Sequence, residues 1–495
     1  MNFPAGEWLA ACPSQSVTIG GALLLVLVAR VRRVAAKSAD LTLLLTAVSA
    51  AAAALSMDAP RGFVVDGLLV ADPFGAFFSF LLALAAMVVV WMWTRSREHG
   101  PVASATDWAL FLGSLGAMQV IVCASHFGVV WAGLTVVGLA SARWLSLSGR
   151  DAAMRSWAMD TAAQSSAAAA WMLLGLALLL GFSATLEYAP AAAKLSVALA
   201  APGGKAVLLV GLALVLFGMS QSLGMVPSAS SRVGAVGKAR LSVGAWLLVG
   251  LPLTAVAVLL RLARALCEIS SDGVWTAWPG VEWPTVLSVL AMITMTVANV
   301  AALREVNLKR LVAWWSVAHL GYLGMALSVL RDRTVDAVLF DAVIYAAMVP
   351  GALLMLAPLV EQRGGAAVEV LRGIARETGG SRRVAIVVAL FLLSLSGVPP
   401  LAGYEARAGL MKAVFESDRW VLMAVATINS GLGLLCCTRL LLLMVDAPRE
   451  QQHPLSLDGD TGLLAGLLVA VIVGAGLWPA TLHLFVQRSA MFFTG

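Results

Sequence analysis

Charged side chains are scarce in this sequence. Lys, Arg, Asp and Glu together make up 12% of the 495 residues, whereas 60% of the residues are hydrophobic. A soluble domain carries about twice that charged fraction, so the composition excludes a soluble globular protein. Cysteines are also few: none of the five stands in a CxxC or another metal-ligand spacing. No haem, iron–sulfur or nucleotide-binding motif is present, which predicts a chain without a metal or redox cofactor of its own.

The distribution of charge also argues against a nucleic-acid-binding protein. The formal net charge is +6, but the basic residues are scattered through short segments and form no patch. The opening segment, MNFPAGEWLAACPSQS, lacks the basic region of a cleaved signal peptide. We therefore expect the first apolar run to be retained as a membrane span, and we expect the lipid bilayer to surround most of the chain.

What the sequence does have is a series of apolar runs, each long enough to cross a bilayer. The alternating pattern of barrel strands is absent, so the runs predict helices and an all-α polytopic membrane protein. We count about fourteen runs, the Ala-rich second and sixth being the weakest; residues 191–201, after Pro190, are an alternative surface helix. The runs are residues 16–33, 39–57, 73–94, 106–124, 127–146, 161–183, 205–226, 241–263, 283–302, 311–330, 335–358, 384–415, 420–445 and 460–485.

Lys and Arg are unevenly distributed between the connecting loops. Loops after odd-numbered runs are rich in them, for example Arg30 to Lys37 after the first run, and Arg232, Lys238 and Arg240 after the seventh. Loops after even-numbered runs hold mainly Asp and Glu. By the positive-inside rule the odd loops are cytoplasmic, which places both termini on the outer, periplasmic side.

The twelfth run is interrupted in its middle. Its segment LSLSGVPPLAGYEAR, residues 393–407, contains Pro399 and Pro400, and a regular helix cannot continue through them. Glu405 and Arg407 follow directly. A charge at this depth costs several kcal/mol and marks a functional-site candidate, although a charge that only secures packing fits equally well. The seventh run has a similar interruption at Pro227, in FGMSQSLGMVPSASSR.

The two interruptions indicate an internal repeat. They lie five runs apart, and an odd offset inverts the direction of crossing, as inverted repeats require. We predict two inverted five-helix repeats with broken helices 7 and 12: residues 106–263 (runs 4–8) and residues 283–445 (runs 9–13). Residues 1–105 would form an N-terminal three-helix segment and residues 460–495 a C-terminal helix.

Residues 303–327 read LREVNLKRLVAWWSVAHLGYLGMAL. This segment resembles the antiporter-like membrane subunits of respiratory complex I, the NADH–quinone oxidoreductase, and is most similar to subunit N. The resemblance continues through residues 393–407 to Ile428-Asn429-Ser430. It implies a bacterial inner-membrane subunit that contacts other membrane-arm subunits of a proton-translocating enzyme. It also implies that flavin, iron–sulfur clusters and quinone belong to partner subunits.

The sequence departs from the family at its ionisable positions. Where the family has a glutamate in helix 5, a lysine and a histidine around the break of helix 7, a lysine in helix 8 and a lysine in helix 12, this chain has Thr135, Ser222, Ala229, a position near Pro252, and Arg407. Because arginine keeps its proton in proteins, Arg407 cannot relay one. The resemblance therefore implies a degenerate proton path and a structural or coupling role. In the alternative, the diverged first half aligns differently and Asp107, Asp160, Lys205 or Lys238 substitutes.

Three other residues are proton-path candidates. His319 could carry a proton or make a structural hydrogen bond. Lys309 could carry a proton or anchor the topology. Glu405 could carry a proton or be a local charge partner of Arg407. Asp341 and Tyr345 could reach the same central region. Two alternative functions stay open: a subunit of a multisubunit cation/proton antiporter, and a subunit of a hydrogenase- or ferredoxin-linked membrane complex.

Overall fold

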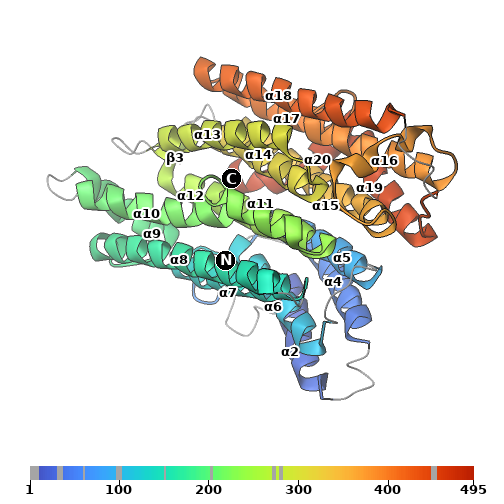
Figure 1. The fold of residues 1–495 in the computed structure, drawn as a ribbon. Coiled ribbons are helices and arrows are strands. Elements are labelled where there is room, and N and C mark those ends of the chain that lie inside the picture. Colours follow the sequence, from blue (N-terminus) through green and yellow to red (C-terminus); the bar gives the residue numbers. More distant parts are fainter. Residues whose placement is uncertain are drawn as a thin grey trace.

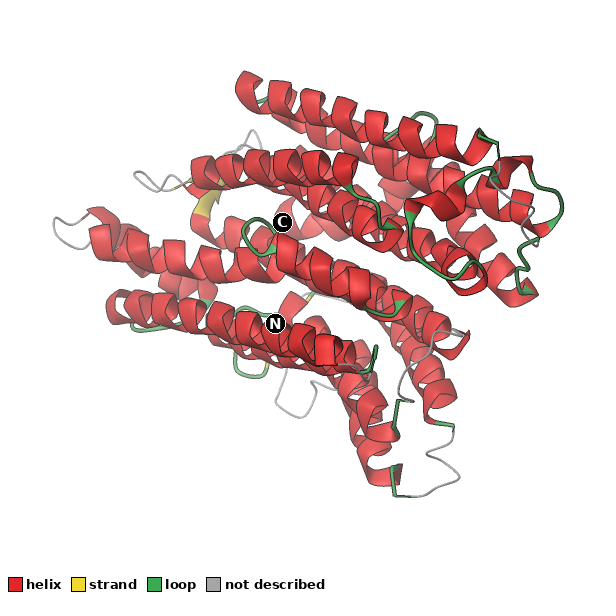
Figure 2. Cartoon of the chain, in the orientation of Figure 1, coloured by secondary structure: helices red, strands yellow, loops and turns green. Residues whose placement is uncertain are grey.

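The computed structural model describes residues 11–30, 37–58, 62–95, 103–149, 152–200, 205–269, 275–277, 283–329, 331–447 and 454–494. Most of these residues are helical, as Figure 2 shows. The described strands form two antiparallel hairpins: β1 (Gly62–Val64) pairs with β2 (Leu69–Ala71), and β3 (Cys267–Ile269) pairs with β4 (Trp275–Ala277). The predicted all-α polytopic class is confirmed.

The first half of the chain forms one layer of helices, coloured blue to green in Figure 1. Its helices are α2 (Pro13–Val28), α4 (Ser38–Leu55), α5 (Pro73–Arg95), α6 (Ala105–Val122), α7 (Phe127–Ser146), α8 (Ala152–Ser183), α9 (Tyr188–Ala200), α10 (Lys205–Leu223), α11 (Ala229–Lys238) and α12 (Leu241–Leu266).

The second half lies alongside, coloured yellow to red. Its helices are α13 (Trp283–Arg304), α14 (Leu308–Leu327), α15 (Asp332–Gln362), α16 (Gly380–Ser396), α17 (Ala402–Phe415), α18 (Trp420–Val445), α19 (Gly459–Leu477) and α20 (Pro479–Thr494), with short 3₁₀ turns at Val368–Leu371 and Ile374–Arg376.

The predicted count of fourteen spans is not confirmed. Among the described residues, eleven helices are long and apolar enough to cross a membrane, or twelve if the pair Val368–Arg376 and Gly380–Ser396, bent by 117°, counts as one. The apolar helix Pro13–Val28 is shorter. Helix α14 is not among the eleven: it carries Lys309, Arg310 and His319, and it is buried by neighbouring helices along nearly its whole length.

Both predicted interruptions are present. Helix α10 ends at Leu223 and α11 begins at Ala229, while α16 ends at Ser396 and α17 begins at Ala402. Pro252 behaves differently, because α12 continues through it. Residues 188–200 after the sixth run form the separate helix α9.

Helix α12 lies at the junction between the two layers. The apolar window of this helix is 100% buried inside the protein, against 17% for the peripheral α19. Its sequence is apolar on every face over Leu241–Leu260, which is typical of a helix surrounded by other helices. Helix α12 packs against α5 and α6 of the first half and against α14 and α15 of the second. It therefore links the two halves.

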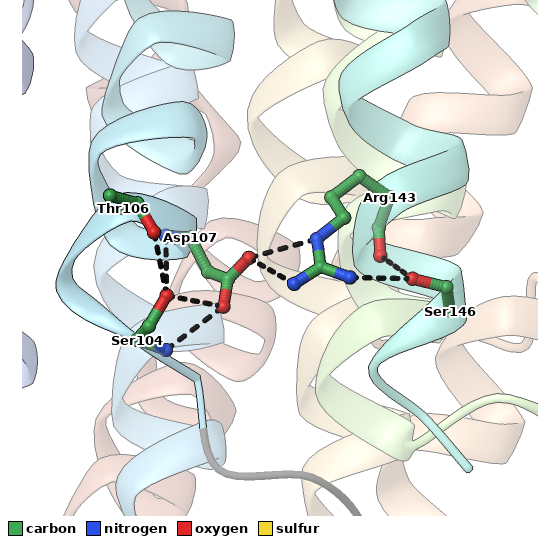
Figure 3. A network of polar contacts seen from close by, with 5 residues as sticks. All are labelled: Ser104, Thr106, Asp107, Arg143 and Ser146. Carbon is green, nitrogen blue, oxygen red and sulfur yellow. Dashed lines mark hydrogen bonds and ion pairs between the residues drawn. The ribbon is translucent and has the colours of Figure 1, made fainter. Parts of the chain in front are cut away.

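A polar joint fixes α6 to α7 at one end of the first half (Figure 3). Ser104 caps α6 by accepting a hydrogen bond from the backbone N–H of Asp107, and the Asp107 carboxylate accepts one from the Ser104 N–H. The other carboxylate oxygen accepts from Arg143 Nε at 2.9 Å and Nη2 at 2.7 Å. Asp107 is thus occupied in a helix cap and an ion pair.

A second ion pair, fully buried, joins α5 to α12 at the opposite end of α6. Arg261 donates from Nη1 and Nη2 to the two Asp72 carboxylate oxygens at 2.9 and 2.8 Å. Asp72 also accepts a hydrogen bond from the Gly75 N–H at the start of α5, and Arg261 Nε donates to the Val122 carbonyl. The pair fixes three helix ends together.

We predict that Arg261→Met destabilises the protein by about 3–5 kcal/mol, because it leaves a buried carboxylate without its counter-ion. Thermal unfolding of the purified protein in detergent measures the loss. The double variant Arg261→Met/Asp72→Asn should recover part of it, since no unpaired charge is left. An Arg261→Met variant as stable as the wild type would contradict this role of the pair.

Candidate functional site

The first helix break, between α10 and α11, is capped by an arginine of α11. Gly224, with φ of 76°, ends α10 in the left-handed region that glycine tolerates. Arg232, on α11, turns back and donates from Nη2 to the carbonyls of Ser222 at 2.7 Å and Gln221 at 3.3 Å. The last carbonyls of a helix have no partner within it, and lipid supplies none. The guanidinium supplies that partner.

The second break has the same construction. Gly397, also with φ of 76°, ends α16. Arg407 on α17 donates from Nη1 to the Ser396 carbonyl at 2.6 Å and from Nη2 to the Leu395 carbonyl at 2.8 Å. Its positive charge also interacts favourably with the negative, C-terminal end of the α16 dipole. The site candidate Arg407 is therefore a buried cap of the broken helix.

Glu405 does not occupy the position expected of a charge partner. The recorded ion pairs of the described residues include none between Glu405 and Arg407, and Glu405 is only half-buried. The two residues are two positions apart and so lie on different faces of α17. Instead of Glu405, the Arg407 guanidinium lies 4.6 Å from the centre of the Tyr322 ring on α14.

Between the two breaks lies a buried histidine–aspartate pair. His319 Nε2 on α14 and Asp341 Oδ2 on α15 are 2.9 Å apart, with residue exposures of 2% and 0%. The other polar atoms of the pair, His319 Nδ1 and Asp341 Oδ1, have no protein partner within the described residues. Buried polar atoms of this kind are ordinarily bonded to ordered water.

Tyr345 connects this pair to α12. Its ring stacks on the His319 imidazole, with centroids 5.1 Å apart and planes inclined by 15°. Its hydroxyl is 2.5 Å from Ser316 Oγ and donates to the Leu248 carbonyl of α12 at 2.5 Å. The sequence expectation that Asp341 and Tyr345 reach the region of His319 thus agrees with the geometry. The arrangement can bind one proton between the His319 imidazole and the Asp341 carboxylate, and the hydrogen-bonded Tyr345 lies beside them.

Lys309 lies elsewhere. It is buried at the start of α14, where its Nζ donates to the Ala239 carbonyl at 3.0 Å, between α11 and α12. The pair Glu305–Arg310, 3.1 Å, stands at the same end of the helix. His319 is ten residues further along α14, about 15 Å by the helical rise. The structure does not bring Lys309 into the His319–Asp341 cluster.

The positions where the family has ionisable residues are neutral and bonded locally. Thr135 Oγ1 donates to the Trp131 carbonyl at 2.8 Å, and Ser222 Oγ to the Gly218 carbonyl at 3.4 Å, each four residues back in its own helix. Ala229 is the buried first residue of α11, and Pro252 lies inside α12. These side chains offer no titratable group along the first half.

A cavity with a partly polar lining nevertheless adjoins the first break. It holds about 60 Å³ between α7, α8, α10, α11 and α12, and its polar lining includes Gln164, Gln221, Ser222, Ser228 and Arg232. One water needs roughly 10–15 Å³ measured in this way. The cavity therefore has room for several waters next to the Arg232 guanidinium.

Arg232 is the site residue that sequence reasoning missed. It follows an apolar run, so the positive-inside rule accounts for it as a loop charge. A signal was nonetheless present: Gly224 and Pro227 are spaced as Gly397 and Pro400 are, and an arginine follows each pair.

The fold defines a class. A buried helical bundle with two broken helices and a polar cluster between them is the architecture of antiporter-like membrane subunits. The family model described as "NADH:quinone oxidoreductase/Mrp antiporter, TM" matches residues 124–433, and the chain belongs to this family. Within it, the chain is an antiporter-like membrane-arm subunit of the complex I subunit N type.

Two similar relatives carry that assignment. The chain is 28% identical over 513 residues to NADH-quinone oxidoreductase subunit N of an Anaeromyxobacter species, covering 100% of this chain and 98% of the relative. It is 30% identical over 500 residues to NADH-quinone oxidoreductase subunit N 2 of Sorangium cellulosum, covering 97% of each.

Solved structures show the same fold. A chain of respiratory complex I from Thermus thermophilus matches with a TM-score of 0.77 and 21% identity, covering 95% of this chain and 98% of that one. A chain of an archaeal membrane-bound sulfane sulfur reductase matches with a TM-score of 0.83 and 16% identity, covering 97% of each. A chain of the Mrp complex from a Dietzia species matches at 0.79 and 16%, covering 96% and 97%. The chain is a multi-pass protein of a respiratory membrane complex, with other membrane-arm subunits as its partners.

We predict that Gly397→Ala destabilises the protein by at least about 1 kcal/mol, since φ of 76° disfavours a Cβ. The added Cβ would also lie 2.8 Å from Arg407 Nη1 and force the cap to move. Gly431→Ala, in the middle of α18 with no atom within 4 Å of its Cβ, is the matched control and should be neutral or slightly stabilising. Thermal unfolding in detergent compares the two; equal effects would contradict the cap.

Proposed function

We propose that this chain serves the membrane arm of a proton-translocating NADH–quinone oxidoreductase in a bacterial inner membrane. Flavin, iron–sulfur clusters and quinone would then be held by partner subunits. The basic loops after odd-numbered spans support an orientation with both termini on the periplasmic side. The subunit N names and full-length coverage of the two relatives support the electron donor and acceptor class.

The chain's own role is in packing and coupling, with the family's proton relay degenerate. The observation that carries this proposal is the local bonding of Thr135 and Ser222 together with the capping role of Arg407. Hydroxyls cannot hold a charge, and a guanidinium does not release its proton. Among the buried side chains that the structure describes near the breaks, the His319–Asp341 pair is protonatable, so coupling is rerouted to it.

A second candidate is a subunit of a multisubunit cation/proton antiporter, and a third is a subunit of a hydrogenase- or ferredoxin-linked complex. The fold similarity to the Mrp and sulfane sulfur reductase chains motivates them. The subunit N relatives, which align over nearly the whole chain, favour the first function. Loss of sodium tolerance without loss of NADH oxidation in a deletion strain would favour the antiporter instead.

We predict that Asp341→Asn slows proton transfer through this chain by about 10²-fold, because the pair loses its charged acceptor. Fewer protons should be taken up per NADH oxidised, while assembly and electron transfer persist. Proton uptake and NADH oxidation are measured together in inverted membrane vesicles.

Thr135→Val and Ser222→Ala are the matched controls and should leave proton uptake per NADH unchanged. Both remove a hydroxyl that only bonds its own helix. If either one lowers proton uptake as Asp341→Asn does, the first-half relay is functional and the proposal of a degenerate path is wrong.

A further inference from the structure

An apolar groove lies on the surface of the protein between α4, α5 and α19. It has a volume of about 290 Å³, and its lining is almost entirely apolar: Leu43, Met87, Val88, Trp91, Asp460, Leu463, Leu464 and Leu467. Leu463 and Leu467 are 67% and 57% exposed, so the groove is open to the surroundings of the protein. For a multi-pass membrane protein these surroundings are lipid hydrocarbon. The groove is therefore suited to an acyl chain.

An exposed ion pair stands beside this apolar groove. Arg95, the last residue of α5, places Nη2 2.9 Å from Oδ2 of Asp460 in the first turn of α19. The two side chains are 49% and 58% exposed, so each has a face that does not touch the other. Arg95 also lies over the Trp91 ring, 4.9 Å from its centre. Arginine and tryptophan at a helix end are typical of the level of lipid head groups.

A second, partly polar hollow adjoins the same ion pair, because Arg95 is also in its lining. This polar hollow holds about 60 Å³ between the ends of α5 and α15 and the starts of α12 and α19, and its lining includes Ser242, Glu361 and Asp458. Ser242 is 1% exposed, and its hydroxyl has no hydrogen-bond partner among the described residues. Buried hydroxyls are ordinarily bonded, so this one indicates a ligand in the hollow.

We infer that the apolar groove and the polar hollow together bind one phospholipid with a primary ammonium head group, of the phosphatidylethanolamine class. An acyl chain lies in the groove and the phosphate binds Arg95, since a guanidinium is a strong partner for phosphate oxygens. The ammonium enters the hollow beside Asp458 and Glu361 and donates to the Ser242 hydroxyl. The inference depends on the membrane setting of the fold and not on the proposed proton path.

The chemistry of the hollow distinguishes between lipid classes. An ammonium has three N–H donors, and carboxylates and a hydroxyl are its acceptors. The trimethylammonium of phosphatidylcholine has no N–H to donate. The glycerol head group of phosphatidylglycerol has no positive charge to place beside Asp458 and Glu361. Phosphatidylethanolamine alone among the three combines a phosphate for Arg95 with a donating cation for the hollow.

The test is native mass spectrometry of the full-length protein, purified in detergent, stripped of lipid and titrated with each of these three phospholipids. The dissociation constant of the first bound lipid is measured. We expect phosphatidylethanolamine to bind about tenfold more tightly than the other two, because only it makes the charge-assisted hydrogen bonds of the ammonium. Equal affinities for the three lipids would overturn the inference.

Two substitutions test the head-group contacts. Ser242→Ala should weaken phosphatidylethanolamine several-fold and leave phosphatidylcholine unchanged, without lowering the unfolding temperature of the lipid-free protein, since the hydroxyl bonds no described residue. Arg95→Gln should weaken all three lipids, because each carries a phosphate. Arg419→Gln, an exposed arginine at the start of α18, is the matched control and should weaken none. Wild-type lipid binding in both Ser242→Ala and Arg95→Gln would overturn the inference.

A third substitution tests the acyl chain in the complete complex. Leu463→Trp fills the apolar groove, whereas Leu484→Trp on α20 changes an equally exposed leucine, 65% against 67%, outside its lining. The phosphatidylethanolamine that remains with the purified complex is extracted and quantified. We expect about one molecule less per complex in Leu463→Trp than in Leu484→Trp. Equal amounts would mean that a helix of a neighbouring subunit fills the groove, and the inference would be wrong.

Discussion

The free carbonyls at two interrupted helices are the constraint on which the rest of this structure depends. A helix that stops inside a membrane leaves its last carbonyls without partners, and lipid provides none. Here Arg232 and Arg407 fold back and bond those carbonyls. Because their guanidinium groups occupy the space beside Gly224 and Gly397, a Cβ at either position would force the arginine cap to move. The breaks, the glycines and the arginines therefore form two interdependent units.

The choice of arginine has a chemical consequence. Its planar group carries five N–H donors in a fixed fork, so one side chain can bond two successive carbonyls, as Arg407 does with Ser396 and Leu395. A lysine presents a single point charge but can release its proton. A residue suited to capping a break is consequently unsuited to relaying protons. In this chain Arg232 and Arg407 do the capping, and under the proposed function proton exchange belongs to His319 and Asp341.

Much of the architecture could be predicted from the sequence because its causes are local. Apolar runs predict helices, and Gly397 with Pro399 and Pro400 predicts a break, since proline removes a donor wherever the helix lies. The site was only partly predictable. His319 and Asp341 are 22 residues apart on two helices, so nothing local pairs them. Glu405 and Arg407, which are two positions apart in sequence, do not meet because residues at this spacing point to different faces of a helix. The count of fourteen spans is not confirmed, and α14, which is surrounded by protein and carries charge, is one helix that length and composition leave out.

The two halves differ in what they contribute to one cluster. The second half supplies the histidine and the aspartate, whereas the first half supplies the Leu248 carbonyl that Tyr345 bonds. Tyr345 thus contacts both halves through a single side chain, its ring on His319 and its hydroxyl on α12. Because α12 is packed on all sides, it cannot move without displacing its neighbours. Those neighbours are chiefly α5, α6 and α15.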